Sequence, residues 1–401
     1  MTKKILAAML AGVMCAVAVP AQAAPPMLHT SGRSIVDSNG ATVQLKGFNL
    51  GGWFVMESFM SPMDSGGLTD TYSVMQQLTS RFDLATQRSL MQTYQQAWIT
   101  AADLDNIKNG GFNALRVPVW WGQFFALDNP TTAGWRSDAF TMLDWVVNAA
   151  AARGLYVIID MHGVIGGQNV QATTGRANSN AYWTNSAYQS DTAWMWWQIA
   201  NHYKDNPAVA GYDLINEPMG APDKAAVWSA YSKLYTSVRQ ADLGHMIFLE
   251  GTFGNWNWDM LPAPSQYGWS NIVYEMHEYQ TNASASKILA GSAAQVTDFN
   301  NHAAWNVPGY IGEFNDFSAG AAIWQQSINS YNKSGLSWTM WSYKAVNGVA
   351  PNPWGWYDPV RWPQRPNVST DSAAEIARKW GLWSSAATFG KNTALGVQPS
   401  Y

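Results

Sequence analysis

Two glutamates follow strand-like runs, and together they could cleave a glycosidic bond. Glu217 ends the run "GYDLINE" (residues 211–217), and Glu313 lies near the end of "PGYIGEF" (residues 308–314). Such cleavage needs one protonated carboxyl group to give a proton to the leaving oxygen, and one ionised carboxylate to attack the anomeric carbon. Either run alone would fit an ordinary polar turn, because Asn and Pro are common where strands end. A catalytic role for the two glutamates is therefore favoured only if other functional side chains lie at the same edge of the fold.

Polar and aromatic side chains recur at the ends of other strand-like runs. They are Arg116, His162, Asn216, His277, Tyr279 and Trp341. A nearby cation favours the charged form of a carboxyl group, so we expect Arg116 to help keep the attacking glutamate ionised. Asn and His side chains offer donors and acceptors to sugar hydroxyls, and Trp341 would form an apolar floor under a sugar ring. Folding alone does not require a polar or aromatic side chain at the end of so many strands. These six residues therefore predict a substrate site.

The elements that must position these residues alternate between strands and helices. Eight strand-like runs cover residues 43–50, 112–119, 155–162, 209–216, 245–251, 271–279, 308–314 and 336–343. Amphipathic stretches follow Ser137, a predicted N-cap, and cover roughly 190–203, 222–240, 292–304, 321–334 and 372–384. Eight alternations favour an α/β fold, a parallel (β/α)8 TIM barrel whose strand ends meet at one mouth. Residues 33–45 contain an Asn-Gly turn and predict a β-hairpin that covers the barrel floor.

The first 23 residues have the pattern of a secretory signal peptide. Lys3 and Lys4 precede a short apolar run, and an A-x-A cleavage site ends at Ala23. Cys15, the one cysteine of the chain, lies inside this segment, so the mature protein would hold no disulfide. No linker-like tract divides residues 24–401, which we expect to form one catalytic domain. The predicted address is the periplasm or the medium of a bacterium.

Composition narrows the class of ligand. A formal net charge of −4 argues against nucleic acid and anionic membrane surfaces as partners. Aromatic residues make up 13% of the chain and charged residues only 12%, with 23 tryptophans. Sugars present apolar C–H faces that stack on aromatic rings, so a poly- or oligosaccharide partner is expected. One or two of the loop residues Trp256, Trp258, Trp354 and Trp356 are expected to line sugar subsites.

The motifs of several other enzyme classes are absent from the sequence. It contains no H-E-x-x-H zinc motif, no G-x-S-x-G elbow, no Walker A loop and no Rossmann fingerprint after a strand. We therefore expect neither a metal nor an organic cofactor. The chain is also expected to be a monomer.

Taken together, the strand-end motifs resemble those of glycoside hydrolase family 5, the cellulase-type family. The motifs are "ALRVPV" with Arg116, "IIDMHG" with His162, "DLINEP" with Asn216 and Glu217, "MHEY" with His277 and Tyr279, "IGEF" with Glu313, and "WTMWSY" with Trp341. The resemblance spans nearly the whole predicted mature chain. It implies a retaining β-glycosidase that uses Glu217 as acid/base and Glu313 as nucleophile, without a cofactor.

The N-terminal half is most similar to the exo-β-1,3-glucanases of that family. In "GFNLGGWFVMESFMSP" the resemblance assigns Glu57 to the terminal glucose, and in "HGVIGGQN" it assigns Gln168 and Asn169 to the substrate site. "IFLEG" with Glu250 is instead more similar to endoglucanase or glycosylceramidase-type members. An endo-acting β-1,4-glucanase, a hydrolase of a branched bacterial exopolysaccharide and a non-catalytic carbohydrate-binding barrel stay open as alternatives.

Overall fold

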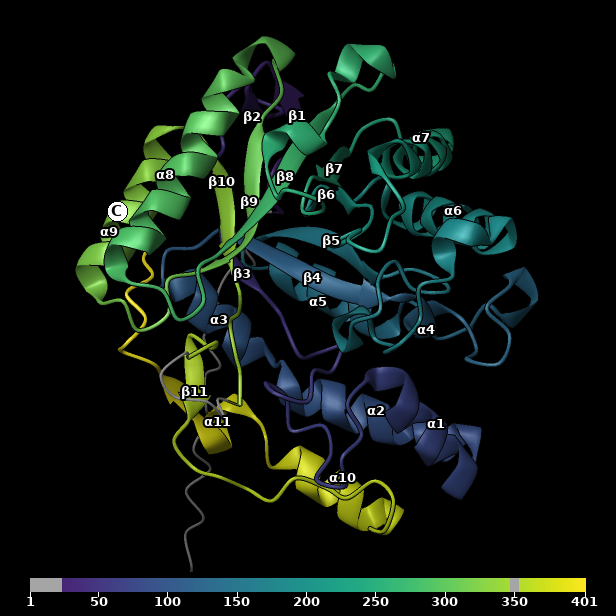
Figure 1. Ribbon diagram of the computed structural model, residues 1–401. Helices are drawn as coiled ribbons and strands as arrows, with labels where there is room; N and C mark the ends of the chain where they lie inside the picture. Colours follow the sequence, from purple (N-terminus) through teal and green to yellow (C-terminus); the bar gives the residue numbers. More distant parts are fainter. Residues whose placement is uncertain (1–23, 347–352) are drawn as a thin grey trace, which may run out of the picture.

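A closed parallel barrel forms the centre of the computed structural model, which describes residues 24–346 and 353–401 (Figure 1). Its strands are β3 (Lys46–Asn49), β4 (Ala114–Trp120), β5 (Tyr156–Gly163), β6 (Val209–Asp213), β7 (Met246–Glu250), β8 (Ile272–Tyr279), β9 (Gly309–Asn315) and β10 (Ser337–Met340). β10 pairs with β3 and closes the ring. All eight predicted strands, and the TIM barrel, are confirmed. Their runs are almost wholly apolar because strands of a parallel sheet are buried on both faces.

Most of the predicted helices are present on the outside of the barrel. They are α5 (Thr141–Ala151), α6 (Ser186–Tyr203), α7 (Lys224–Ala241), α8 (Ala285–Asn301), α9 (Ala321–Lys333) and α10 (Ala373–Gly381). The predicted cap at Ser137 is wrong, because Arg136 pairs with Asp138 and holds a turn that delays the start of α5. α8 begins at Ala285, earlier than predicted, because the Ser284 side chain accepts from the backbone of Lys287 and caps it.

Three helices between β3 and β4 were not predicted. They are α1 (Thr71–Arg81), α2 (Leu84–Trp98) and α3 (Ala101–Asn109). Asp70 and Asp83 cap α1 and α2 by accepting hydrogen bonds from backbone N–H groups. Figure 1 shows α10 beside α2, where the indole of Trp380 donates to the backbone of Pro62. The shorter elements are α4 (Trp121–Phe124), β11 (Tyr357–Pro359), α11 (Ser385–Thr388) and β12 (Phe389–Lys391).

A hairpin covers the floor of the barrel, although its position differs from the prediction. It consists of β1 (Leu28–Ser31) and β2 (Ser34–Asp37), and its turn contains Gly32 with φ +59°. The predicted Asn39–Gly40 turn also forms, but its far side makes only one isolated bridge, between Val36 and Thr42. Leu28 and Ile35 pack against residues at the starts of the barrel strands, such as Ala114 and Met246. The location at the floor is therefore confirmed, and the range 33–45 is corrected to 28–37.

Neither the predicted signal peptide nor the segment 347–352 belongs to the described residues. Within the part of the chain that is described, no helix is both long and apolar enough to cross a membrane.

Candidate active site

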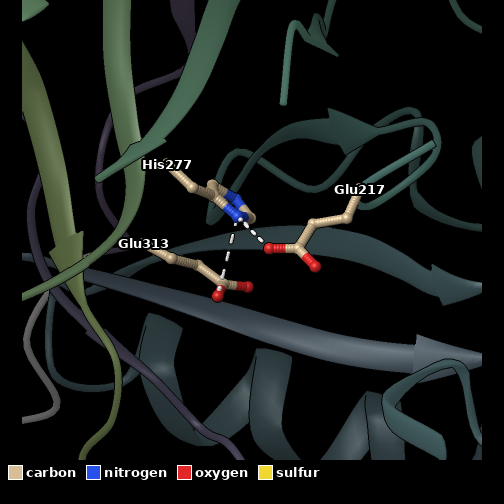
Figure 2. Close-up of side chains that lie close together, drawn as sticks. All are labelled: Glu217, His277 and Glu313. Carbon is tan, nitrogen blue, oxygen red and sulfur yellow. Dashed lines mark hydrogen bonds and ion pairs between the residues drawn. The ribbon is translucent and has the colours of Figure 1, made fainter. Parts of the chain in front are cut away.

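The two predicted glutamates meet at the mouth of the barrel. Glu313 lies in β9, and Glu217 follows β6. Three atoms lie within 4.8 Å of one another: a carboxylate oxygen of Glu217, a carboxylate oxygen of Glu313 and a ring nitrogen of His277 (Figure 2). Retaining glycosidases hold their two carboxyl groups about 5–5.5 Å apart, whereas inverting enzymes leave about 6.5–9.5 Å for a water molecule. The arrangement fits direct attack on the sugar by one of the two groups.

Glu313 has a hydrogen-bond donor on each carboxylate oxygen. Arg116 Nη1 donates to Oε1 at 2.8 Å, and the Tyr279 hydroxyl donates to Oε2 at 2.8 Å. Only 4% of Glu313 is exposed. The two donors hold the carboxylate in one orientation, which suits a nucleophile.

Glu217 has the environment of a proton donor. Burial raises its pKa, while His162 and Arg116 act in the opposite direction. His277 Nδ1 lies 3.0 Å from Glu217 Oε1. A buried carboxyl group with a raised pKa stays protonated at a pH where an exposed one is ionised, and this is the state that an acid catalyst requires.

The backbone of Glu217 adopts an unusual conformation. Its φ of +40° lies in the left-handed region, which residues with a side chain rarely occupy. The N–H of Glu217 donates to Glu250 Oε2 at 2.7 Å, and its carbonyl accepts from Asn169 Nδ2 at 2.9 Å. Conformations of this kind persist where the surroundings hold them, and they gather at active sites.

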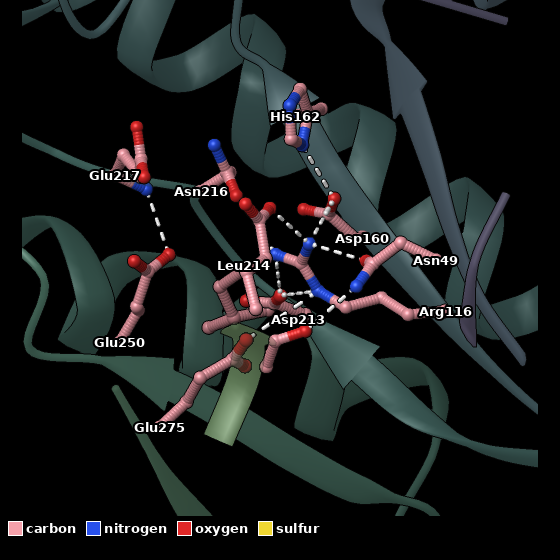
Figure 3. A network of polar contacts seen from close by, with 12 residues as sticks. Asn49, Arg116, Asp160, His162, Asp213, Leu214, Asn216, Glu217, Glu250 and Glu275 are labelled. Atoms are coloured by element: carbon pink, nitrogen blue, oxygen red, sulfur yellow. Dashed lines mark hydrogen bonds and ion pairs between the residues drawn. The ribbon is translucent and has the colours of Figure 1, made fainter. Parts of the chain in front are cut away.

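Arg116 is the centre of the buried network below the two glutamates (Figure 3). Its side chain is fully buried, and it lies within hydrogen-bond or ion-pair distance of Asn49, Asp160, Asp213, Asn216, Glu275 and Glu313. The bond to Asn216 Oδ1 is 2.8 Å long, and Figure 3 shows the amide nitrogen of Asn216 pointing away from Arg116. That nitrogen can therefore donate to a sugar hydroxyl.

The acidic residues around Arg116 were not predicted. Asp160 and Asp213 lie within quoted motifs, and Glu275 lies inside a strand-like run, but none was assigned to the site. Burial raises the pKa of Asp160 to about 7 and that of Asp213 to about 6, even though Arg116 opposes both shifts. These residues could have been recognised from the sequence as carboxylates inside otherwise apolar strands. Burying a carboxylate costs free energy unless it is paired, so such a position indicates a buried partner.

Both predicted histidines are held as neutral rings. Burial lowers the pKa of His162 to about 4 and that of His277 to about 3. His162 Nδ1 lies 2.7 Å from Asp160 Oδ2, and its ring stacks on Trp341 with a centroid distance of 5.2 Å. A neutral imidazole has one donor and one acceptor nitrogen, so each ring can orient a hydroxyl or a carboxyl group.

Gln168 and Asn169, which were expected to bind substrate, contact backbone groups next to the site. Gln168 Nε2 donates to the carbonyls of His162 and Asn216, each at 2.8 Å, and Gln168 Oε1 accepts from the N–H of Val164. Asn169 Oδ1 accepts from the N–H of Gln171, while its nitrogen holds the carbonyl of Glu217. Both amides hold backbone groups, so the pair positions Asn216 and Glu217, and a direct contact of either with a sugar stays a prediction.

Aromatic residues surround the mouth, although fewer loop tryptophans face it than the composition suggests. Trp341 packs with Met60, Tyr279 and Trp354. Trp258 and Trp356 are buried in the main core, where Trp356 stacks on Phe48, and the partly buried Trp256 packs against that core. Trp354 is the one of the four predicted loop tryptophans that contacts a site residue, with its ring 5.7 Å from that of Tyr279.

Glu57 lies near enough to Glu217 and Glu313 for their charges to affect its pKa, while its predicted contact with a terminal glucose stays a prediction. Only 2% of the residue is exposed, and burial raises its pKa well above the usual value, with Glu313 and Glu217 adding to the shift. Among the described residues, nothing forms a hydrogen bond to Glu57 Oε1. A buried oxygen without a partner is costly in the free protein, and a sugar hydroxyl could satisfy it.

Comparison with known proteins identifies the family of the chain. The family model described as cellulase, glycosyl hydrolase family 5, matches residues 75–347. The chain belongs to glycosyl hydrolase family 5. Family 5 membership confirms the resemblance read from the motifs and makes the protein a β-glycoside hydrolase. The absence of a metal or cofactor from the reaction stays a prediction.

Family 5 relatives carry related names. A β-xylosidase of Phanerodontia chrysosporium is 27% identical over 345 residues, covering 80% of this chain and 71% of that protein. A glucan 1,3-β-glucosidase of Candida oleophila is 27% identical over 308 residues, covering 71% and 70%. The crystal structure of rutinosidase from Aspergillus niger has a TM-score of 0.62 at 19% identity, covering 78% of this chain and 93% of that one, and shows a shared fold.

Proposed function

We propose that the protein is an exported, retaining β-glucosidase that removes glucose from the end of a β-glucan, with Glu217 as acid/base and Glu313 as nucleophile. The observation that carries the proposal is the pair of carboxylate oxygens within 4.8 Å, in two environments of opposite character. Glu313 has a donor on each oxygen, whereas burial raises the pKa of Glu217.

The reaction would take place in two steps. In the first, Glu217 gives its proton to the leaving oxygen while Glu313 attacks the anomeric carbon and forms a glycosyl-enzyme. In the second, the ionised Glu217 takes a proton from water, the water attacks the anomeric carbon, and Glu313 leaves. Tyr279 and Arg116 hold Glu313 in line, and each step inverts the anomeric centre once, so the product keeps the β configuration.

Two observations support a β-glucan end as the substrate. Several of the matched relatives are named as glucan 1,3-β-glucosidases. Glu57 also places a buried oxygen without a partner beside the catalytic pair, where it could accept from hydroxyls of a terminal sugar. The signal-like residues 1–23 support export into the periplasm or the medium of a bacterium.

Laminarin should yield glucose as its first and only small product. A site that recognises a chain end removes one unit at a time, and chromatography of early reaction products checks this expectation. Glu57→Ala should raise the KM for laminarin, measured from initial rates, because it removes the buried oxygens that a terminal sugar would contact. A ladder of oligosaccharides from laminarin or carboxymethyl-cellulose would contradict exo action and favour the endo-glucanase alternative. Absence of hydrolysis across β-glucans, branched bacterial exopolysaccharides and aryl β-glycosides would favour a carbohydrate-binding barrel.

The activity should also fall at alkaline pH through loss of the Glu217 proton. Because the folded-state pKa of Glu217 is raised, the acid form persists above the usual carboxyl range, and kcat/KM declines only as the pH passes that raised pKa. A pH profile with an alkyl β-glucoside, whose leaving group needs protonation, should show this alkaline limb. The limb should vanish in Glu217→Ala assayed with an activated aryl β-glucoside, and its persistence there would assign the acid to another residue.

A further inference from the structure

Glu250 contacts the proposed acid/base residue through the backbone. It is the last residue of β7 and is fully buried, and its Oε2 accepts the hydrogen bond from the Glu217 N–H at 2.7 Å. That N–H belongs to a residue with φ +40°, so the contact holds a conformation that a residue with a side chain disfavours. The carboxyl group of Glu250 therefore contributes to the direction of the Glu217 side chain.

Glu250 also reaches Glu217 a second way, through His277. The other oxygen of Glu250, Oε1, lies 3.4 Å from His277 Nε2, and His277 Nδ1 lies 3.0 Å from Glu217 Oε1. The imidazole thus stands between the two carboxyl groups. Neither Glu250 Oε1 nor His277 Nε2 forms a hydrogen bond to the described residues, so a proton held between them would satisfy both atoms. Glu275 Oε1 lies at the same distance of 3.4 Å from His277 Nε2.

We propose that Glu250 is a positioning residue that sets both the backbone and the hydrogen-bond partner of Glu217. As a neutral acid, Glu250 accepts from the Glu217 N–H with one oxygen and donates from the other to His277 Nε2. His277 then carries its proton on Nδ1. This N–H donates a hydrogen bond to the Glu217 carboxylate when Glu217 is ionised in the glycosyl-enzyme. The inference rests on the proposed function, because it assigns Glu217 as the acid/base.

The charges around Glu250 agree with a neutral carboxyl group. Burial raises its pKa well above the usual value, and Asp213 and Glu217 raise it further, against Arg116. The contact with Thr252 acts against this rise in the pKa of Glu250, as Arg116 does, and the Tyr231 hydroxyl donates to the Glu250 backbone carbonyl. Glu275 is the other acid at His277 Nε2, at 3.4 Å, and it too has a raised pKa. Of these two acids it is Glu250 that also accepts the hydrogen bond from the Glu217 N–H, so Glu250 is assigned the positioning role.

The test compares Glu250→Gln with Glu250→Met on two substrates. A glutamine amide can accept from the Glu217 N–H and donate to His277, so Glu250→Gln should keep kcat/KM within about threefold on both substrates. Methionine has a similar size but can neither accept the hydrogen bond from the Glu217 N–H nor donate one to His277. Because positioned proton transfer contributes about 10²–10⁴-fold, Glu250→Met should lose about 10–100-fold on an alkyl β-glucoside. It should lose no more than about threefold on a dinitrophenyl β-glucoside, whose leaving group needs no proton.

Two further variants keep the test decisive. Glu250→Asp retains the acid but withdraws it from both contacts, so it should behave as Glu250→Met does and replaces that variant if methionine prevents folding. Asp242→Asn is the matched control, because Asp242 is a buried carboxylate paired with His245 and lies outside the site. Any effect of that control should be equal on the two substrates.

The outcomes separate this inference from the proposed function. If the wild-type protein hydrolyses neither substrate, the proposed function fails. If it hydrolyses both, equal losses on the two substrates in Glu250→Met and Glu250→Asp would show a merely structural role and overturn the inference alone. A loss in Glu250→Gln as large as that in Glu250→Met would also overturn it.

Discussion

Glu313→Ala is expected to lower kcat on a dinitrophenyl β-glucoside by at least about 10⁴-fold, because no other carboxylate can form the glycosyl-enzyme. The substrate isolates this role, since its leaving group departs without a proton. Alanine should leave the fold intact, because Glu313 lies at the mouth and its two donors, Arg116 and Tyr279, keep other neighbours. Steady-state rates with the purified variant check the loss.

Sodium azide should restore part of the activity of Glu313→Ala. The small anion can occupy the space that the carboxylate leaves and attack the anomeric carbon, and one inversion of a β-glucoside gives an α-glucosyl azide. In Glu217→Ala the glycosyl-enzyme still forms, so azide attack on it gives the β-glucosyl azide. Product stereochemistry by NMR therefore distinguishes the two roles. An α-azide from Glu217→Ala and a β-azide from Glu313→Ala would exchange the assignments of the two glutamates.

The second large effect is expected from Arg116→Met, which should lower the free energy of unfolding by about 3–5 kcal/mol. Removing one partner of a buried ion pair leaves the other charge without compensation. Here the guanidinium lies within ion-pair distance of Asp160, Asp213, Glu275 and Glu313. Urea unfolding followed by tryptophan fluorescence measures the change. The control is Arg153→Met, which removes a more exposed pair with Asp105 and should cost no more than about 1 kcal/mol.

The loss in Arg116→Met should depend on pH in a defined direction. Asp160 and Asp213 have folded-state pKa values of about 7 and about 6, above the ordinary value of 3.8 for the unfolded chain. Such groups stabilise the folded state at low pH, and this contribution is lost as the pH rises through the folded-state pKa. Without Arg116 both pKa values rise further, so the variant should lose more stability at pH 8 than at pH 5. An equal loss at both pH values would contradict the network as described.

The barrel could be predicted because its strands leave a strong pattern. Strands buried on both faces, such as β5 and β7, are almost wholly apolar and end on polar residues, so they can be recognised one at a time. α1 to α3 were missed although Asp70 and Asp83 mark the starts of two of them. The hairpin range was wrong because the Asn39–Gly40 turn is real but is not the turn that joins the two strands.

The site was predictable wherever topology alone brings residues together. Glu217 and Glu313 are far apart in the sequence, but parallel strands deliver both to one mouth. A motif gives the position of a side chain and not its partners, so the contacts of Gln168 and Asn169 with the backbone of Asn216 and Glu217 could not be predicted from the sequence. Asp160 and Glu275 were not predicted because they lie within their strands, where the sequence sets a carboxylate apart less clearly than it does at a strand end.

The most direct test of the central claim is covalent labelling with 2,4-dinitrophenyl 2-deoxy-2-fluoro-β-glucoside. The fluorine slows both steps and the activated leaving group restores the first, so a glycosyl-enzyme should accumulate. Intact mass spectrometry should show one added fluoroglucosyl group, and peptide mapping should place it on Glu313. A label on Glu217 or another carboxylate, or turnover of β-glucosides with no label and an α-configured first product, would contradict the account.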